Sequence, residues 1–258
     1  MPDAAQTIAA AKPDILILGG SDLRAALLAG WRDFRAAPIY GLFFASVFVA
    51  GGWLIVYALT ATGQVWWTLP AAAGFPILGP FIACGLYEVS RRLEAGAPPS
   101  WRAVLGVIAR QKDRQIPSIA AVVVVFFLFW NFLAHMIFAL FLGLQAMTNI
   151  TSSFEVFLTA NGLLMLLVGS IIGAVFAGVL FSLTVVSLPL LLDREVDFVT
   201  AMIASVSVVL TNPGVMLLWG GLIAVLLFGS MAMGFLGLFV TLPVLGHATW
   251  HLYRRALA

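Results

Sequence analysis

Four long stretches of this chain contain no charged side chain, and they limit its fold more than any other feature. They cover residues 36–87, 115–154, 156–192 and 198–253 of a 258-residue sequence. A helix that crosses the hydrocarbon core of a bilayer needs about 20 mostly apolar residues, because it spans about 30 Å at about 1.5 Å per residue. Each uncharged stretch is long enough for at least one such helix.

The composition points to the same environment. Hydrophobic residues make up 62% of the chain and charged residues 9%, whereas an ordinary soluble domain is about 25% charged. So few charges could not cover a water-exposed surface, which excludes soluble enzymes and disordered proteins. The 13 basic and 11 acidic residues leave a net charge of +2, so no basic surface for nucleic acid is expected. The predicted partner is the lipid bilayer.

The first three uncharged stretches predict four spans, and the number of spans in the last stretch is open. The four predicted spans cover residues 39–60, 67–87, 117–142 and 162–188. The last stretch holds one surface helix followed by either one or two spans. In the two-span alternative, residues 213–253 form a hairpin that turns near residues 234–237.

The distribution of Lys and Arg decides between these alternatives, because cytoplasmic loops retain basic residues. With six spans, all 13 basic residues fall on one side, and the turns at residues 61–66 and 143–161 carry none. With five spans, Arg254 and Arg255 would lie on the opposite side. We therefore predict an all-α polytopic transmembrane helix bundle of six spans, with short amphipathic interfacial helices and both termini in the cytoplasm.

The chain is expected to form one domain. Residues 1–20 contain only a short apolar patch and predict a flexible cytoplasmic arm, and residues 21–258 form the six-helix transmembrane domain. The lone Cys84 excludes an intrachain disulfide and is expected to be a small buried apolar residue.

The two ends of the chain share a pattern that predicts a parallel internal repeat. Pro38 follows Asp22 at the same interval as Pro213 follows Asp197. Each proline opens a predicted span, where its missing N–H is not needed. Between each aspartate and its proline, apolar residues recur at the spacing of a helix that lies on the membrane surface. The predicted halves are residues 22–92 and 197–255; the alternative is coincidence among Ala, Leu and Val.

Glycine and proline interrupt the second and sixth predicted spans. Within a membrane, unwound backbone is tolerated only against protein or a cavity, so such interruptions can mark a binding site. The alternative is a simple kink that neighbouring helices accommodate. The candidate binding locus consists of Pro76, Gly79, Pro80, Pro243, Gly246, His247 and His251.

His247 and His251 are four residues apart and share a helix face at the spacing of a metal-ligand pair. This pair predicts either a haem or metal site or an interfacial helix end. The third histidine, His135, lies most of a bilayer away from them, so one ion could not be held by all three. Asn131 and His135 share a face, and we expect them to form hydrogen bonds to other helices. No cofactor is predicted.

A track of small residues runs along the fourth predicted span: Gly169, Gly173, Ala174 and Gly178. Such a track permits close approach of another helix, either from this chain or from a second copy or another protein. No nucleophile with a neighbouring base, phosphate-binding glycine loop or carboxylate pair is visible in the sequence. We therefore expect that the protein is not an enzyme.

Several phrases of the sequence occur together in one known family. They are Gly74-Phe75-Pro76, Gly85-Leu86-Tyr87-Glu88, Ser187-Leu188-Pro189 and Gly246-His247-Ala248-Thr249-Trp250-His251. Over roughly residues 20–256, the chain resembles the bacterial integral membrane family labelled domain of unknown function 2189. This resemblance implies a multi-pass protein of a bacterial inner membrane, and it implies no activity.

Three functional hypotheses follow. The first is a non-enzymatic scaffold or assembly partner of a membrane complex, acting through the small-residue track on another membrane protein or on a second copy. The second is a small transporter or permease with a site between the second and sixth spans. The third is haem or metal handling through His247 and His251.

Overall fold

The computed structural model describes residues 14–62, 68–143 and 154–258, and every named element within these ranges is a helix. This result confirms the all-α prediction. The elements, in chain order, are α1 (Gly20–Ala36), α2 (Pro38–Thr62), α3 (Thr68–Glu94), α4 (Trp101–Gln111), α5 (Ile116–Leu142), the 3-10 helix η3 (Phe154–Leu158), α6 (Ala160–Thr184), α7 (Ser187–Asp193), α8 (Phe198–Thr211), α9 (Pro213–Ala232) and α10 (Leu238–Ala256).

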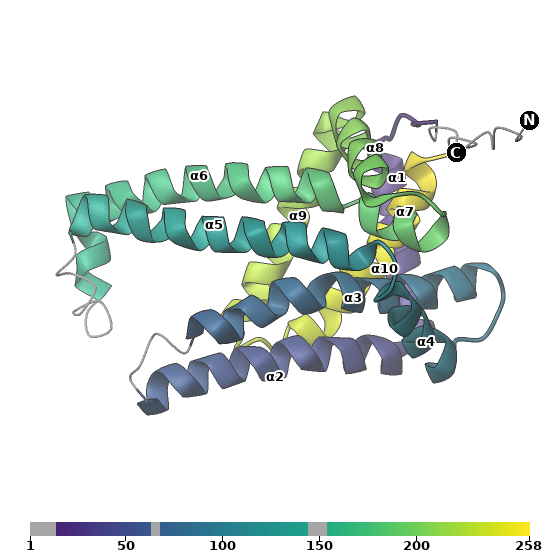
Figure 1. Cartoon of the computed structure of the whole chain (residues 1–258), viewed down its shortest axis with the longest axis horizontal. Coiled ribbons are helices and arrows are strands. Elements are labelled where there is room, and N and C mark those ends of the chain that lie inside the picture. The colour runs from purple at the N-terminus through teal and green to yellow at the C-terminus, as the bar shows by residue number, and fades with distance from the viewer. Residues whose placement is uncertain (1–13, 63–67, 144–153) are drawn as a thin grey trace, which may run out of the picture.

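The long helices form a bundle, and the short ones gather at one end of it (Figure 1). α5 and α6 pack against each other, and α2 and α3 form a second pair. α1, α4, α7 and α8 lie at the end where α10 finishes. We call this end the basic end, because every Lys and Arg within the described ranges lies on α1 or α4, at the C-terminal ends of α3 and α10, or in the adjoining loops.

Four helical segments of the described residues are long and apolar enough to cross a membrane. They are Pro38–Ala58, Ile116–Leu142, Ala160–Asp193 and Pro213–Ala232. They correspond to the first, third, fourth and fifth predicted spans, so a multi-span arrangement is supported. The second and sixth predicted spans coincide with α3 and α10, and their crossing of the membrane stays a prediction.

The helix boundaries have local causes. Ser100 Oγ accepts a hydrogen bond from the Ala103 N–H at 3.3 Å and caps α4. Asp197 caps α8 through the Thr200 N–H at 2.9 Å. Hydrogen bonds from the Thr200 side chain and main chain hold the pKa of the Asp197 carboxyl below its usual value. Ser100 and Asp197 belong to the residue types that cap helix N-termini best.

The single residues that join α1 to α2 and α8 to α9 have nearly the same backbone geometry. Ala37 adopts φ −141° and ψ 55°, and Asn212 adopts φ −123° and ψ 51°. Each donates its N–H to the carbonyl four residues earlier and precedes the proline that opens the next helix. Each lies at the same place in the two segments of the predicted repeat. The repeat itself stays a prediction.

α10 lies in the middle of the basic end and contacts α1, α2, α3, α7 and α9. Its closest neighbour is α1. A Cβ atom on Gly30 would lie 2.6 Å from the Ala248 nitrogen and 2.7 Å from the Val244 carbonyl oxygen. Only glycine fits at this crossing, because the two nearest atoms that a side chain would meet belong to the backbone of α10.

The described segment that leads into α1 meets the C-terminal residues beside these two helices. The Leu16 N–H donates to the Ala256 carbonyl at 2.9 Å, and the Ala258 N–H donates to the Asp14 carbonyl at 3.0 Å. The Leu18 N–H donates to Asn212 Oδ1 at 2.7 Å. These bonds hold part of the segment that was predicted as a flexible arm. Residues 1–13 of that arm lie outside the described residues.

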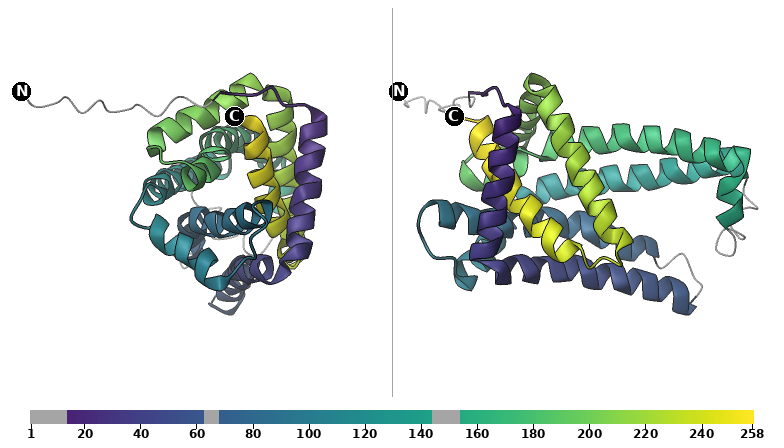
Figure 2. Two further views of the ribbon diagram at one scale, coloured as in Figure 1. Left: turned by 90° about the vertical axis from the view of Figure 1, so that its right-hand side faces the viewer. Right: turned by 180° about the vertical axis from the view of Figure 1, so that it is seen from behind.

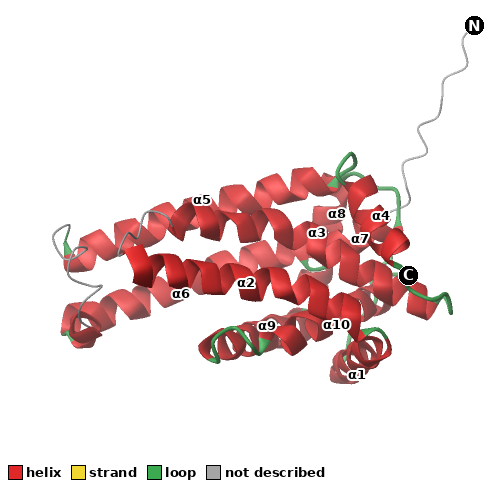
Figure 3. Ribbon diagram, turned by 90° about the horizontal axis from the view of Figure 1, so that it is seen from below, coloured by secondary structure: helices red, strands yellow, loops and turns green. Residues whose placement is uncertain are grey.

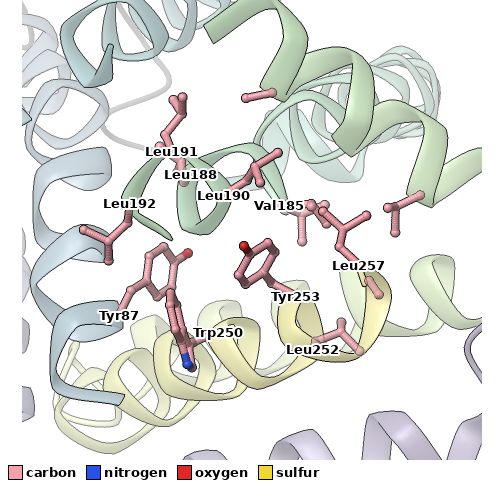
Figure 4. Packing of buried hydrophobic residues seen from close by; sticks show 14 of the residues in the cluster. Tyr87, Val185, Leu188, Leu190, Leu191, Leu192, Trp250, Leu252, Tyr253 and Leu257 are labelled. Carbon is pink, nitrogen blue, oxygen red and sulfur yellow. The ribbon is translucent and has the colours of Figure 1, made fainter. Parts of the chain in front are cut away.

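The largest cluster of buried apolar side chains lies at the basic end. There the side chains of α7 pack against Tyr87, Trp250 and Tyr253 of α3 and α10 (Figure 4). By contrast, only 17% of the most apolar 18-residue stretch of α5 is buried inside the protein. For the segment Ala160–Asp193 the corresponding share is 6%. The α5–α6 pair therefore presents most of its apolar surface outwards, as helices in lipid do.

We predict that Gly30→Ala lowers the thermal unfolding midpoint of the protein in detergent. The added methyl group would meet backbone atoms of α10, and overpacking of this kind costs about 1–3 kcal/mol. The matched control is Gly221→Ala in α9, where a Cβ atom meets nothing within 4 Å. The control is expected to melt at the same or a higher temperature. Equal midpoints for Gly30→Ala and the wild type would contradict the α1–α10 packing.

Candidate functional site

The two histidines of α10 each bind a different helix. His247 is fully buried, and its Nδ1 lies 2.8 Å from Ser90 Oγ of α3. His251 Nε2 lies 2.7 Å from Asp33 Oδ2 of α1. Because α10 passes between α1 and α3, the two rings link α10 to both neighbours.

The two histidines use their ring nitrogens differently, and the haem or metal hypothesis stays a prediction. His251 Nε2 is occupied by Asp33, and His247 Nε2 is buried without a hydrogen-bond partner. Within the described residues, no group of three or more His, Cys, Asp or Glu side chains could hold a metal ion.

The rest of the C-terminal half of α10 binds acidic side chains. Trp250 Nε1 donates to Glu94 at 3.0 Å, and the Tyr253 hydroxyl donates to Asp193 at 2.8 Å. Arg254 binds the same two carboxylates, each at 3.3 Å. Together with the two histidines and their partners, these side chains form what we call the α10 network. No pattern in the sequence indicates this network, because its partners lie far apart in the chain.

The described residues of the predicted binding locus have different surroundings, and a shared site among them stays a prediction. A Cβ on Gly246 would lie 2.7 Å from Leu86 Cδ1, and one on Gly41 would lie 2.7 Å from Pro243 Cβ, so these positions serve close packing. A Cβ on Gly79 would meet nothing within 4 Å, and Pro80 is buried. The side chain of Pro76 lies outside the described residues. Neither of the two cavities described next is lined by a residue of this locus.

The larger of these cavities, about 740 Å³, is a groove between α5, α6 and α9. Aromatic side chains of α5, among them Phe126 and Trp130, form one wall, and Ala224 and Phe228 of α9 form another. Ser170 supplies the hydroxyl of an otherwise apolar lining. The second cavity, about 370 Å³, lies at the basic end beside Arg114 and Glu195, which form an ion pair at 2.7 Å.

The predicted small-residue track lies in and beside this groove. Gly169, Gly173 and Ala174 line it. A Cβ on Gly173 would lie 2.9 Å from Trp130 Cη2, and one on Gly169 would lie 3.9 Å from Ile137 Cγ2. Gly173 therefore allows α6 to approach α5 of the same chain, whereas a side chain at position 169 would make an ordinary contact. A Cβ on Gly178 would meet nothing within 4 Å.

The expectation that Asn131 and His135 bind other helices is wrong. Asn131 Nδ2 donates to the Phe127 carbonyl at 2.8 Å, and His135 Nδ1 lies 2.7 Å from the Asn131 carbonyl oxygen. Both contacts lie within α5, because a polar side chain in a helix can reach the carbonyl one turn earlier.

The long apolar helices form a bundle, and the buried core and the charged side chains lie at one end of it. These features define a multi-span integral membrane protein with a helical bundle fold. The family comparison agrees with this class. A family model described as "Predicted integral membrane protein (DUF2189)" matches residues 68–193. The resemblance noted in the sequence is therefore confirmed, over a narrower segment than residues 20–256. Neither the curated proteins nor the solved structures that were compared gave a match.

We predict a measurable coupling between Asp33 and His251. In a double-mutant cycle of Asp33→Ala and His251→Ala, the coupling free energy for unfolding is expected to be about 1.5–3 kcal/mol, since the pair is largely shielded from solvent. The control cycle removes Arg114 and Glu195, which are 52% and 83% exposed; exposed pairs contribute about 0.2–1 kcal/mol. A coupling for Asp33 and His251 that is no larger than the control would contradict their role in holding α1 on α10.

Proposed function

We propose that this protein is a non-enzymatic scaffold of a bacterial inner membrane, which binds a transmembrane helix of another membrane protein in the groove between α5, α6 and α9. The observation that carries the proposal is this groove of about 740 Å³, which lies between helices whose apolar surface is largely exposed. Lipid tails are as apolar as leucine, so helices associate in a membrane through close packing rather than through the hydrophobic effect.

The floor of the groove has the shape that a helix needs. Leu166, Gly169, Gly173, Ala177 and Leu180 line it and recur at helical spacing on one face of α6. This face forms a continuous strip of roughly 20 Å. Gly173 already accommodates Trp130 of α5, so a second helix would pack beside this contact, where Ser170 and Ala174 line the groove and the Ser170 hydroxyl can bond a helix across it.

A non-enzymatic role fits the chemistry of the groove. Its lining contains the Ser170 hydroxyl and no ionisable side chain. The charged groups described above, Asp33, Glu94, Asp193 and their partners, are engaged in contacts between helices at the basic end. We assign these groups to holding the bundle together.

The proposed topology has six spans, with the basic end in the cytoplasm. Two observations support it: α9 and α10 are separated by a turn between Ala232 and Leu238, and the described basic residues lie at one end. Because cytoplasmic loops retain Lys and Arg, the basic end is assigned to the cytoplasm together with the segments that lead to both termini.

Site-specific cross-linking tests the scaffold role. Cys84 is fully buried and can remain in place, so Ser170→Cys introduces one reachable thiol in the groove. We predict that a short apolar cross-linker, used in native membranes, joins this introduced thiol to one discrete polypeptide. The matched control is Ile171→Cys, which changes the next residue in sequence; Ile171 is 57% exposed and is not part of the lining.

A groove-filling substitution makes the test specific. Adding Ala174→Phe to Ser170→Cys is expected to abolish the adduct while the thermal unfolding midpoint stays within a few degrees. Lipid adducts alone, or the same products from Ile171→Cys, would contradict the proposal. An adduct of twice the mass of the chain would assign the groove to a second copy instead of another protein.

A further inference from the structure

The outer face of α1 carries a charged and apolar stripe that the proposed function does not use. It consists of Arg24, Leu28, Trp31, Arg32 and Arg35, and all five side chains are exposed. At 3.6 residues per turn, these positions fall within an arc of about 100°. Leu28 is 54% exposed and Trp31 is 42% exposed, so two large apolar side chains lie among the three arginines. We call these five residues the α1 stripe.

The acids of α1 do not neutralise this stripe. Asp22 binds Arg255 at 3.2 Å, and Asp33 binds His251 at 2.7 Å. Both acidic side chains thus pair with α10, on the other side of the helix. Within the described residues, Arg24, Arg32 and Arg35 have no ion pair or side-chain hydrogen bond. The stripe therefore presents three uncompensated positive charges.

The position of α1 gives the stripe a fixed place relative to the spans. α1 runs across the direction of α5 and α6 at the basic end, and it lies at the rim of the bundle beside α10 (Figures 2 and 3). Its inner face, including Ala26 and Gly30, is buried. The exposed stripe therefore points away from the protein. α2 begins directly after this helix, and Ile39 in its first turn is 59% exposed. The stripe thus lies level with the start of a span.

We propose that the α1 stripe binds the headgroups of anionic phospholipids in the leaflet at the basic end. The arginine guanidinium groups match phosphate geometry, and at the membrane interface Trp31 and Leu28 can insert between the headgroups. A soluble anion or an acidic protein surface would leave these two apolar side chains in water. An anionic lipid surface accommodates charge and apolar area together.

α8 provides the contrast within the same chain. It also lies at the basic end before a span, but the exposed side chains of its outer face are apolar: Val199, Ile203 and Leu210. No residue of α8 is charged. Of these two surface helices, only α1 has the chemistry to distinguish anionic from zwitterionic lipid.

Lipid binding to the purified full-length protein tests the proposal. The protein, in a neutral detergent, is titrated with phosphatidylglycerol or phosphatidylcholine, and bound lipid is counted by native mass spectrometry. The wild type is expected to prefer phosphatidylglycerol. Each arginine near a lipid surface contributes roughly a fivefold change in affinity, so Arg24→Gln, Arg32→Gln and Arg35→Gln together should weaken phosphatidylglycerol binding on the order of 100-fold. Lysine at the same three positions should retain most of the preference.

The matched control removes three charges elsewhere at the basic end. Arg102→Gln, Arg110→Gln and Lys112→Gln change exposed residues in and after α4 and lower the net charge equally. This control is expected to keep the preference for phosphatidylglycerol. An equal loss in the control would overturn the proposal in favour of net charge, and full competition by soluble glycerol phosphate would assign the stripe to a free phosphate ligand.

Folding is checked separately. The three arginines of the stripe are exposed and unpaired, so the glutamine variant should melt at the wild-type temperature without added lipid. If the triple variant is unstable, the single Arg24→Gln variant is used, with an expected loss of roughly fivefold. An unchanged lipid preference in a folded variant would overturn the proposal.

Discussion

α1 and α10 cross at Gly30 and Ala248, where the two backbones come so close that glycine is required. These are the first and the last helices of the described residues. Around the crossing, the Leu16 N–H donates to Ala256, and the Ala258 N–H donates to Asp14. The side-chain contacts of α10 with α1, Asp33 with His251 and Asp22 with Arg255, add to these bonds. The beginning of the described chain and its C-terminus are therefore held on one face of the bundle, and the paths of the helices between them must start and finish there.

The rest of the structure follows from the separation of charge and apolar surface. Polar groups buried in hydrocarbon are costly unless they are bonded, so charged side chains belong at the ends of the spans. In this protein the acidic and basic residues join α1, α3, α7 and α10 at the basic end. Away from that end, α5 and α6 hold together through aromatic and small side chains such as Phe126 and Phe176, whose rings lie 5.9 Å apart. The groove lies in this second region, where small residues leave space beside α9.

Much of the fold could be predicted because its causes are local. Pro38 and Pro213 mark the first residues of α2 and α9, and the uncharged residues 117–142 coincide with α5 within one residue. The contacts of the α10 network could not be predicted in this way, because they join distant parts of the chain. The spacing of His247 and His251 does not indicate that the first ring binds Ser90 and the second binds Asp33. Glycine is ambiguous for the same reason: Gly246 fits a tight contact with Leu86, and a single sequence cannot separate that role from the lining of a cavity.

The side of the membrane on which the C-terminus lies, compared with that of the segment before α6, is the quantity to measure first. One variant is Ala258→Cys, at an exposed position of the basic end, and the other is Leu158→Cys, at a position that is 75% exposed between α5 and α6. Each variant is treated with a membrane-impermeant thiol reagent in right-side-out and inverted inner-membrane vesicles. The thiol at position 258 should react only in inverted vesicles, and the thiol at position 158 should react only in right-side-out vesicles. Reaction of both thiols from the same side, or of the C-terminal one from the periplasm, would contradict an even number of spans with the basic end in the cytoplasm.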